Sequence, residues 1–185
     1  MGKRVGLIVS IAAVVAMCAF IFYMSSFPAD ESTELSMGVV WHIIGFLVPG
    51  YDQMSPADQL YWQQMLDHPV RKTAHFLEYA ALGALTMNAL WQIARTRRVH
   101  DGGADAKAQQ TNDASADGKA SPLPRIRNLA AGAWAFATAY AVTDEVHQMF
   151  VPGRAGMVTD VLLDSAGVLV GVAIVAFVLR RIMHR

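Results

Sequence analysis

Long apolar runs separated by polar segments dominate the pattern of this chain. Four runs are long enough to cross about 30 Å of hydrocarbon as helices that rise about 1.5 Å per residue. They cover residues 5–24, 73–94, 128–150 and 157–179. Their apolar residues lack the period of two that barrel strands show, so helices are the expected way to satisfy the backbone in lipid. The pattern predicts an all-α, polytopic integral membrane protein with four transmembrane helices.

Two other segments differ from these runs. Residues 37–48 are apolar but fall short of the roughly 17 to 25 residues that a span needs, which predicts an interfacial or re-entrant element within an outer segment, residues 27–70. Aromatic side chains typical of a membrane surface occur there: Trp41, Tyr51, Tyr61 and Trp62. Residues 100–121 are rich in Ala, Gly, Asp and Gln and are predicted to be a disordered linker. We therefore expect one membrane domain over residues 1–185 and no separate soluble domain.

Composition and charge support a multi-pass protein of the cell membrane. The chain is 54% hydrophobic and 16% charged, a small charged share for a soluble domain. All of its 15 basic residues except Arg71, Lys72 and Arg154 fall on one side of the predicted spans. Because basic loops stay in the cytoplasm, both termini and the linker are expected there. The single cysteine, Cys18, lies in the first run and excludes an intramolecular disulfide.

The first run has a second interpretation, a cleaved signal peptide, because basic residues precede it. Its length and the lack of a clear cleavage site favour a retained span. With that span in place, the second run enters from outside, the third leaves to outside and the fourth enters again. The outer ends of the last three spans are therefore expected at one depth.

Ionisable and polar side chains gather at those three ends. They are Lys72, His75, Glu78 and Tyr79 in the second run, Asp144, Glu145, His147 and Gln148 in the third, Arg154 in the loop, and Asp160 and Asp164 in the fourth. At about 100° per residue each set falls on one helix face, except that Glu145 points away from its neighbours. An ionisable group inside a span costs at least about 2.5 kcal/mol and normally turns inward to pair or to serve function. The three faces together predict a functional site.

The motifs in these segments resemble those of a known family. They are Lys72-x-x-His75-Phe76-x-Glu78-Tyr79, then Asp144-Glu145-x-His147-Gln148, then Phe150-Val151-Pro152-Gly153-Arg154, and then Asp160 and Asp164, with Ser25-Ser26 and Pro28 after the first run. In this order they resemble the VanZ-like membrane proteins over nearly the whole chain. The resemblance implies a cell-envelope role and a link to glycopeptide resistance of the teicoplanin type. It implies no particular reaction.

Two sets of roles follow from the side-chain chemistry. Candidates for acid or base catalysis are His75, Glu78, Asp144, Glu145, His147 and Asp164. Candidates for holding a substrate or an anionic lipid are Lys72, Tyr79, Gln148, Arg154 and Asp160. A divalent metal is a further possibility, with candidate ligands His75, Glu78, Asp144 and His147. The metal signal is the weaker one, because the HExxH pattern of zinc proteases is absent.

Structural explanations compete with these roles. Asp160 could be a first-turn acid favoured by the helix dipole, and Asp144 with His147 could form a purely structural interhelical pair. Gly167 and Gly171 are expected to let a neighbouring helix approach closely.

Three functions are considered for these residues. The first is an enzyme or lipid-processing site, and the second is a non-catalytic protein that binds an envelope lipid, a glycopeptide or a partner protein. A proton-coupled transporter is disfavoured, because the inner span halves offer only Asn88 and Gln92 as notable polar groups. Membrane lipids, and a lipid-linked envelope precursor or glycopeptide, are the expected partners. Nucleic acid is not an expected partner, and the sequence predicts no oligomeric state.

Overall fold

The computed structural model describes the backbone of residues 2–109 and 126–183. Within these ranges the chain forms five α-helices and one short 3₁₀ helix, and no strand occurs there. The elements are α1 (Gly2–Ser25), α2 (Ala29–Leu47), η1 (Tyr51–Gln53), α3 (Pro56–Gln109), α4 (Ile126–Gln148) and α5 (Val158–Met183). The predicted all-α class is confirmed. Runs 5–24 and 73–94 lie within α1 and α3, and runs 128–150 and 157–179 lie in α4 and α5 except for one or two residues in the loop between them.

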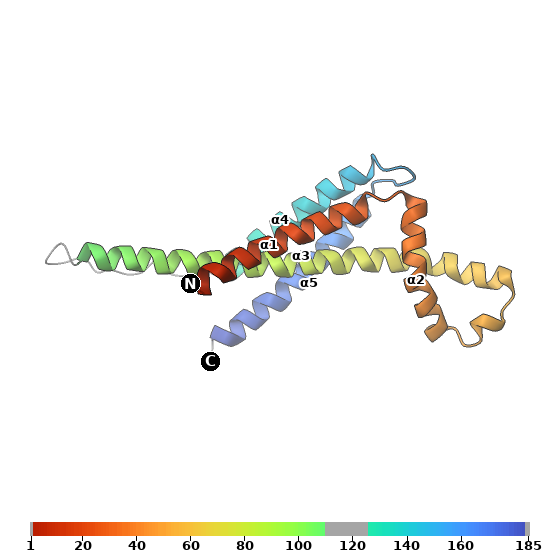
Figure 1. Cartoon of the computed structure of the whole chain (residues 1–185), viewed down its shortest axis with the longest axis horizontal. Helices are drawn as coiled ribbons and strands as arrows, with labels where there is room; N and C mark the ends of the chain where they lie inside the picture. The colour runs from red at the N-terminus through yellow and green to blue at the C-terminus, as the bar shows by residue number, and fades with distance from the viewer. Residues whose placement is uncertain (1, 110–125, 184–185) are drawn as a thin grey trace.

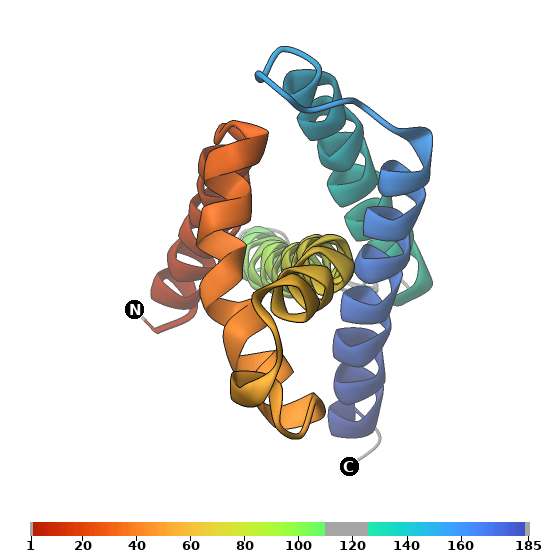
Figure 2. The same ribbon diagram turned by 90° about the vertical axis from the view of Figure 1, so that its right-hand side faces the viewer.

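Helix α3 is the centre of the arrangement. Viewed along this helix, α1 and α2 lie on one side of it and α4 and α5 on the other (Figure 2). Its 54 residues span about 80 Å at about 1.5 Å per residue, so it extends beyond the other helices at both ends (Figure 1). The first turns of α1 and the last turns of α5 lie toward the same end. A single long helix thus contacts every other helix of the fold.

The length of α3 differs from the prediction at both ends. Residues 56–70, expected in the outer segment, continue into the predicted span through Pro69, whose carbonyl accepts a hydrogen bond from the Thr73 hydroxyl at 2.8 Å. The prediction of a disordered linker was wrong for residues 100–109, which are helical. Extending an existing helix adds a hydrogen bond for each residue ordered, without a new nucleus, so a polar, Ala-containing stretch can continue it. The remainder of that linker, residues 110–121, lies outside the described residues.

Helix α2 forms a small core of its own against the first part of α3. Val40, Ile44 and Tyr51 are buried together there, with Trp62 and Leu66 of α3 packed against them. Figure 1 shows α2 running steeply across α3. This packing fixes α2 near the end of the bundle where α1 ends and α5 begins.

The most apolar helices expose much of their surface. Among the described residues, two segments are long and apolar enough to cross a membrane, Arg4–Ser25 and Val158–Met183. Both carry exposed large hydrophobic side chains, among them Ile8, Val15 and Ile174. A soluble protein rarely exposes apolar patches of this extent, so these helices need an apolar environment.

Glycines bring α3 and α5 into close contact. A Cβ atom at Gly171 would overlap the carbonyl oxygen of Ala80, and one at Gly83 would lie only 2.6 Å from the carbonyl oxygen of Val168. Gly167 faces α3 in the same way. The predicted packing role of Gly167 and Gly171 is confirmed, and the facing helix is α3. This contact aligns the beginning of α5 with residues 72–79 of α3.

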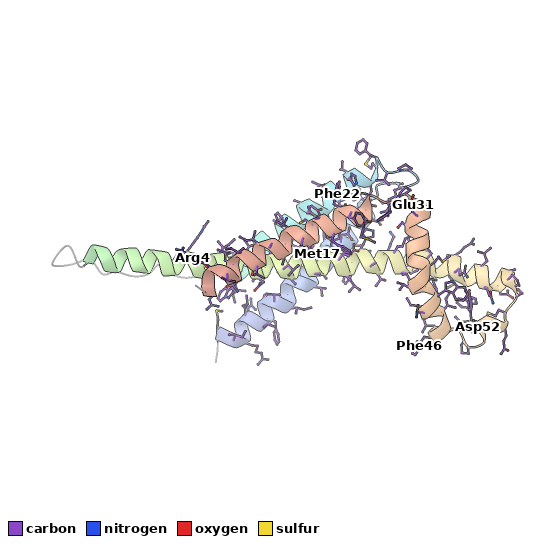
Figure 3. All side chains as sticks on the ribbon, viewed as in Figure 1. Arg4, Met17, Phe22, Glu31, Phe46 and Asp52 are labelled. Atoms are coloured by element: carbon purple, nitrogen blue, oxygen red, sulfur yellow. The ribbon has the colours of Figure 1, made fainter. Side chains whose placement is uncertain are left out.

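Charged residues lie toward both ends of the long axis. Arg4 lies toward the end where α1 begins, whereas Glu31 and Asp52 lie toward the opposite end (Figure 3). The motif residues predicted from the sequence lie at this second end as well.

Candidate functional site

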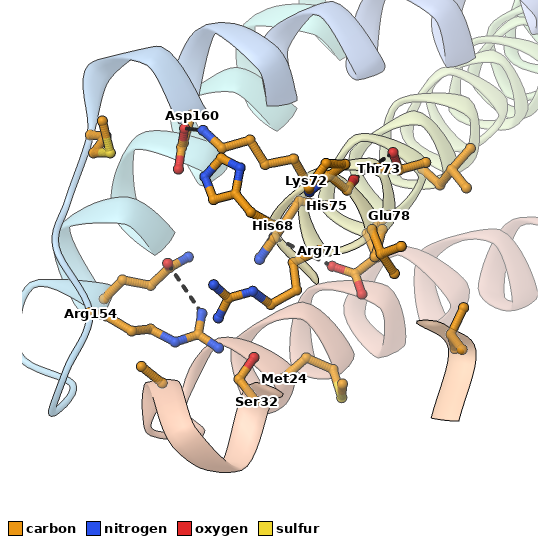
Figure 4. A pocket seen from close by; sticks show the side chains of 18 of the residues that line it. Met24, Ser32, His68, Arg71, Lys72, Thr73, His75, Glu78, Arg154 and Asp160 are labelled. Carbon is orange, nitrogen blue, oxygen red and sulfur yellow. Dashed lines mark hydrogen bonds and ion pairs between the residues drawn. The ribbon is translucent and has the colours of Figure 1, made fainter. Parts of the chain in front are cut away.

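A pocket of about 720 Å³ opens at the end of the bundle where α1 ends and α5 begins. Its walls come from the end of α1, from α2, from residues 68–78 of α3, from Gln148 of α4, and from the loop and first turn of α5. The charged side chains that line it are Arg71, Lys72, Glu78, Arg154 and Asp160, with His68 and His75 beside them (Figure 4). We call it the arginine pocket, after Arg71 and Arg154.

Arg154 is held in place by polar groups that carry no charge. Its Nε donates a hydrogen bond to the backbone carbonyl of Phe27 at 2.9 Å, and its Nη1 donates to Gln148 Oε1 at 3.2 Å. No described carboxylate forms an ion pair with it. Its backbone follows a tight turn at Gly153, whose φ of 74° favours glycine. The turn in this loop thus presents one arginine to the pocket.

The two guanidinium groups of the pocket point toward each other (Figure 4). Partial burial, and then the nearby charge of Arg71, lower the pKa of Arg154 below its ordinary value. An arginine nevertheless stays protonated at neutral pH. The pocket therefore keeps two like charges close together, and an anion between them would relieve their repulsion.

The charge of Lys72 is neutralised by a neighbouring helix. It forms an ion pair with Asp160, and both side chains are about 30% exposed. Asp160 sits in the first turn of α5, where the Thr159 hydroxyl also donates to it at 3.3 Å. The two binding candidates thus neutralise each other. Arg71 forms an ion pair within its own helix, with 3.4 Å from its Nε to Asp67 Oδ2.

His75 and Glu78 form the acid and base candidates that reach the pocket. Both line it, and His75 Nδ1 lies 3.7 Å from Glu78 Oε2. His75 Nδ1 is buried and has no hydrogen-bond partner among the described atoms. A proton could pass between such neighbours with a small movement of either side chain.

A buried layer of polar groups lies behind the pocket. Asp144 is only 4% exposed, and its Oδ2 accepts hydrogen bonds from Ser25 Oγ at 2.8 Å and from Gln148 Nε2 at 3.1 Å. Because Gln148 also bonds to Arg154, a continuous hydrogen-bond chain links the pocket arginine to the end of α1. The second oxygen of Asp144 is buried without a partner in the described part of the chain.

Tyr79, Glu145 and Asp164 are buried and do not line the pocket. Glu145 Oε1 accepts the backbone N–H of Met157 at 2.5 Å and so joins α4 to the start of α5. The Tyr79 hydroxyl lies near Asp144 and Asp164. Neither this hydroxyl nor Asp164 Oδ1 has a hydrogen-bond partner among the described atoms. These residues support the pocket from behind.

His147 does not line the pocket and contacts the end of α1. Its ring stacks on Phe22 with 4.4 Å between centroids, and its Nε2 lies 3.2 Å from Ser26 Oγ. The four proposed metal ligands are therefore divided between different neighbourhoods. Within the described ranges, no three His, Cys, Asp or Glu side chains are grouped as metal ligands.

The candidate list lacked several residues that the tertiary structure brings to the site. Arg71 and His68 line the pocket, and Ser25 contacts Asp144. Arg71 could have been chosen because it is one of the few basic residues on its side of the predicted membrane. The Ser25-Ser26 motif was visible in the sequence, but its partner lies 119 residues away.

The model of the VanZ/LLP1 family matches residues 10–180. The chain belongs to the VanZ/LLP1 family. Neither the curated proteins nor the solved structures give a match. Family membership together with the two exposed apolar helices indicates a membrane protein.

Proposed function

We propose that this VanZ/LLP1 protein crosses the cell membrane four times and holds the anionic group of a cell-envelope molecule in the arginine pocket at the outer face. The spans would be the apolar parts of α1, α3, α4 and α5. Both termini would then lie in the cytoplasm. The pocket would lie at the level of the outer head groups.

Several features support this topology. Besides the two apolar segments already described, α4 exposes large hydrophobic side chains, among them Trp134, Phe136 and Val142, as expected for a helix that faces lipid. The start of α1 and the end of α5 lie toward the same end, which fits an even number of crossings. The sequence places most of the basic residues at the ends of the spans that lie on that side.

Cysteine labelling tests the topology. In a Cys18→Ala background, single cysteines are introduced at Asp52 and at Gln110, and intact cells are treated with a membrane-impermeant maleimide. We expect labelling at residue 52 and protection at residue 110 until the cells are opened. Equal labelling of both positions in intact cells would rule out the proposed orientation.

The observation that carries the anion site is Arg154. It is half-buried, lies beside a second guanidinium and has no ion-pair partner among the described carboxylates. Burying an uncompensated charge costs several kcal/mol, so such an arrangement is expected where a ligand supplies the opposite charge. Guanidinium groups also match the oxygen geometry of phosphate and carboxylate groups.

Thermal unfolding of the purified protein in a neutral detergent tests the anion site. The unfolding midpoint is measured with inorganic phosphate or with phosphatidic acid in the micelles, for wild type and for Arg154→Gln. We expect at least one of these anions to raise the midpoint of the wild type and Arg154→Gln to lose most of that rise. Arg180→Gln, an exposed change at the far end of α5, is the control and should keep it. If neither anion stabilises the wild type, the proposed anion site is wrong.

Acid–base catalysis at the same pocket is a second candidate function. It is favoured by the His75–Glu78 pair, which faces the pocket with one ring nitrogen unpartnered among the described atoms. A general acid or base contributes about 10² to 10⁴ in rate. Lipid profiles of cells that express wild type or Glu78→Gln would therefore differ if Glu78 acts on an envelope lipid, whereas simple binding would leave the profiles alike.

A link to teicoplanin-type resistance is the part of the proposal that rests on family membership alone. Susceptibility is measured in cells that express the wild type, Arg154→Gln or no protein. Resistance that requires Arg154 would connect this phenotype to the pocket. Equal susceptibility in all three strains would remove glycopeptide resistance from the proposal.

A further inference from the structure

The lining of the arginine pocket has two chemically distinct parts. Its charged groups gather where α3 faces the loop before α5 (Figure 4). The remaining walls are largely hydrocarbon, with Met24 of α1, Val39 and Ile43 of α2, and Leu77 of α3 among them. A volume of about 720 Å³ is also that of a site for a molecule of drug size, which is more than a lone anion needs.

The apolar wall continues onto the outer surface of the protein. Val39 is 53% exposed and Leu77 is 59% exposed, although both line the pocket. A pocket that admits its ligand from water would have a polar rim, whereas these residues form an apolar one. The proposed membrane position of α3 puts Leu77 within the first turns of a span, at a depth where lipid chains begin.

We infer that the ligand of the arginine pocket is a membrane lipid with a phosphate head group, which enters sideways from the bilayer past Val39 and Leu77. This inference rests on the proposed function and names the class of its ligand. The phosphate oxygens lie between Arg71 and Arg154. The hydrocarbon chain lies along the wall formed by Val39, Ile43 and Leu77, where it removes apolar surface from contact with water.

This arrangement gives Arg154, which has no carboxylate partner among the described residues, an anion to bind. A lipid phosphate reaches the pocket from the bilayer at high local concentration, so the site needs no steering from bulk water. The lipid chain adds contact area that a free phosphate lacks, and the two contributions act on one molecule. Affinity for the lipid should then greatly exceed affinity for inorganic phosphate.

The test compares three probes on the full chain in neutral detergent: inorganic phosphate, dioleoyl phosphatidic acid and dioleoylglycerol. We expect phosphatidic acid to raise the unfolding midpoint at a concentration at least about tenfold lower than inorganic phosphate. Dioleoylglycerol, which has the chains but no phosphate, should have little effect. Equal potency of phosphate and phosphatidic acid overturns the lipid inference and leaves the anion site standing, while no response to either contradicts the anion site itself.

A variant at the rim gives an independent measurement. Leu77→Gln should weaken phosphatidic acid binding by about tenfold, as expected when apolar contact to a ligand is lost, and leave the response to inorganic phosphate unchanged. Leu169→Gln is the matched control, because Leu169 is 52% exposed on α5 and does not line the pocket. If Leu77→Gln and Leu169→Gln bind phosphatidic acid equally well, the hydrocarbon chain of the lipid does not pass this rim.

Discussion

Helix α3 is held by different forces near the arginine pocket and further along the bundle. Near the arginine pocket, Lys72 pairs with a neighbouring helix, and Asp144 and Arg154 are joined through Gln148. Further along, Leu82, Met87 and Trp91 are buried among apolar neighbours. The polar contacts between helices in this cluster are few: Asn88 Nδ2 donates to Ser10 Oγ at 3.0 Å, and the Tyr140 hydroxyl donates to the Cys18 carbonyl at 2.6 Å.

This contrast separates stability from function. Close packing needs no unpartnered charge, and the apolar half contains none among its described side chains. The pocket half contains the buried carboxylates Asp144, Glu145 and Asp164, and an arginine without a carboxylate partner among the described residues. Such an arginine is tolerated where a ligand supplies the opposite charge. Substitutions at the close contact between α3 and α5 should therefore lower the free energy of unfolding most, and substitutions at the polar contacts should lower it less.

The largest effect is expected at the α3–α5 contact. Gly171→Ala places a methyl group on the Ala80 carbonyl and forces the helices apart, which should cost about 3 kcal/mol. The free energy of unfolding in detergent measures it. Gly132→Ala is the matched control, since its Cβ would meet only Leu90 Cδ1 at an ordinary 3.5 Å. Equal stability of the two variants would mean that the helices are not packed this closely.

A smaller loss is expected where α1 meets the buried layer. Ser25→Ala removes a hydrogen bond from Asp144 Oδ2, and the cost for a buried carboxylate should be about 1 to 2 kcal/mol. Ser26→Ala, next to it and exposed, should cost less than about 0.5 kcal/mol. The free energy of unfolding is measured for both variants. Equal losses would contradict the burial of the Ser25–Asp144 hydrogen bond.

The Lys72–Asp160 ion pair should contribute still less. Both groups are about 30% exposed, so solvent screening limits their coupling energy to about 0.5 to 1 kcal/mol. A double-mutant cycle with Lys72→Met and Asp160→Asn measures this coupling. A parallel cycle with Lys72→Met and Asp58→Asn should give no coupling, and a similar value in both cycles would count against the pair.

The smallest effect is expected for His147, which lies outside the pocket. His147→Ala loses a stacking contact with Phe22 and an exposed hydrogen bond, at a cost of about 0.5 to 1 kcal/mol. The metal content of the purified protein, measured by mass spectrometry, should be the same as in the wild type. A stoichiometric metal that disappears with this change would restore the metal hypothesis.

Much of the local structure followed from the sequence. Apolar periodicity and length located the helices, because backbone hydrogen bonding in lipid leaves few alternatives. The same pattern placed the polar faces of α3, α4 and α5, since helical spacing alone decides which side chains share a face. The continuation of α3 beyond His100 was missed, because composition reports poorly on a helix that merely extends one already formed.

The chemical partners were decided by tertiary structure. The sequence alone established an all-α chain with ionisable groups near helix ends. Only packing determined that Lys72 is neutralised by Asp160, that Arg71 rather than Lys72 faces Arg154, and that Ser25 contacts Asp144. The reason is physical: helical periodicity acts over a few residues, whereas these contacts depend on the distance and rotation of helices far apart in the chain. The glycine contact between α3 and α5 sets them for the Lys72–Asp160 pair.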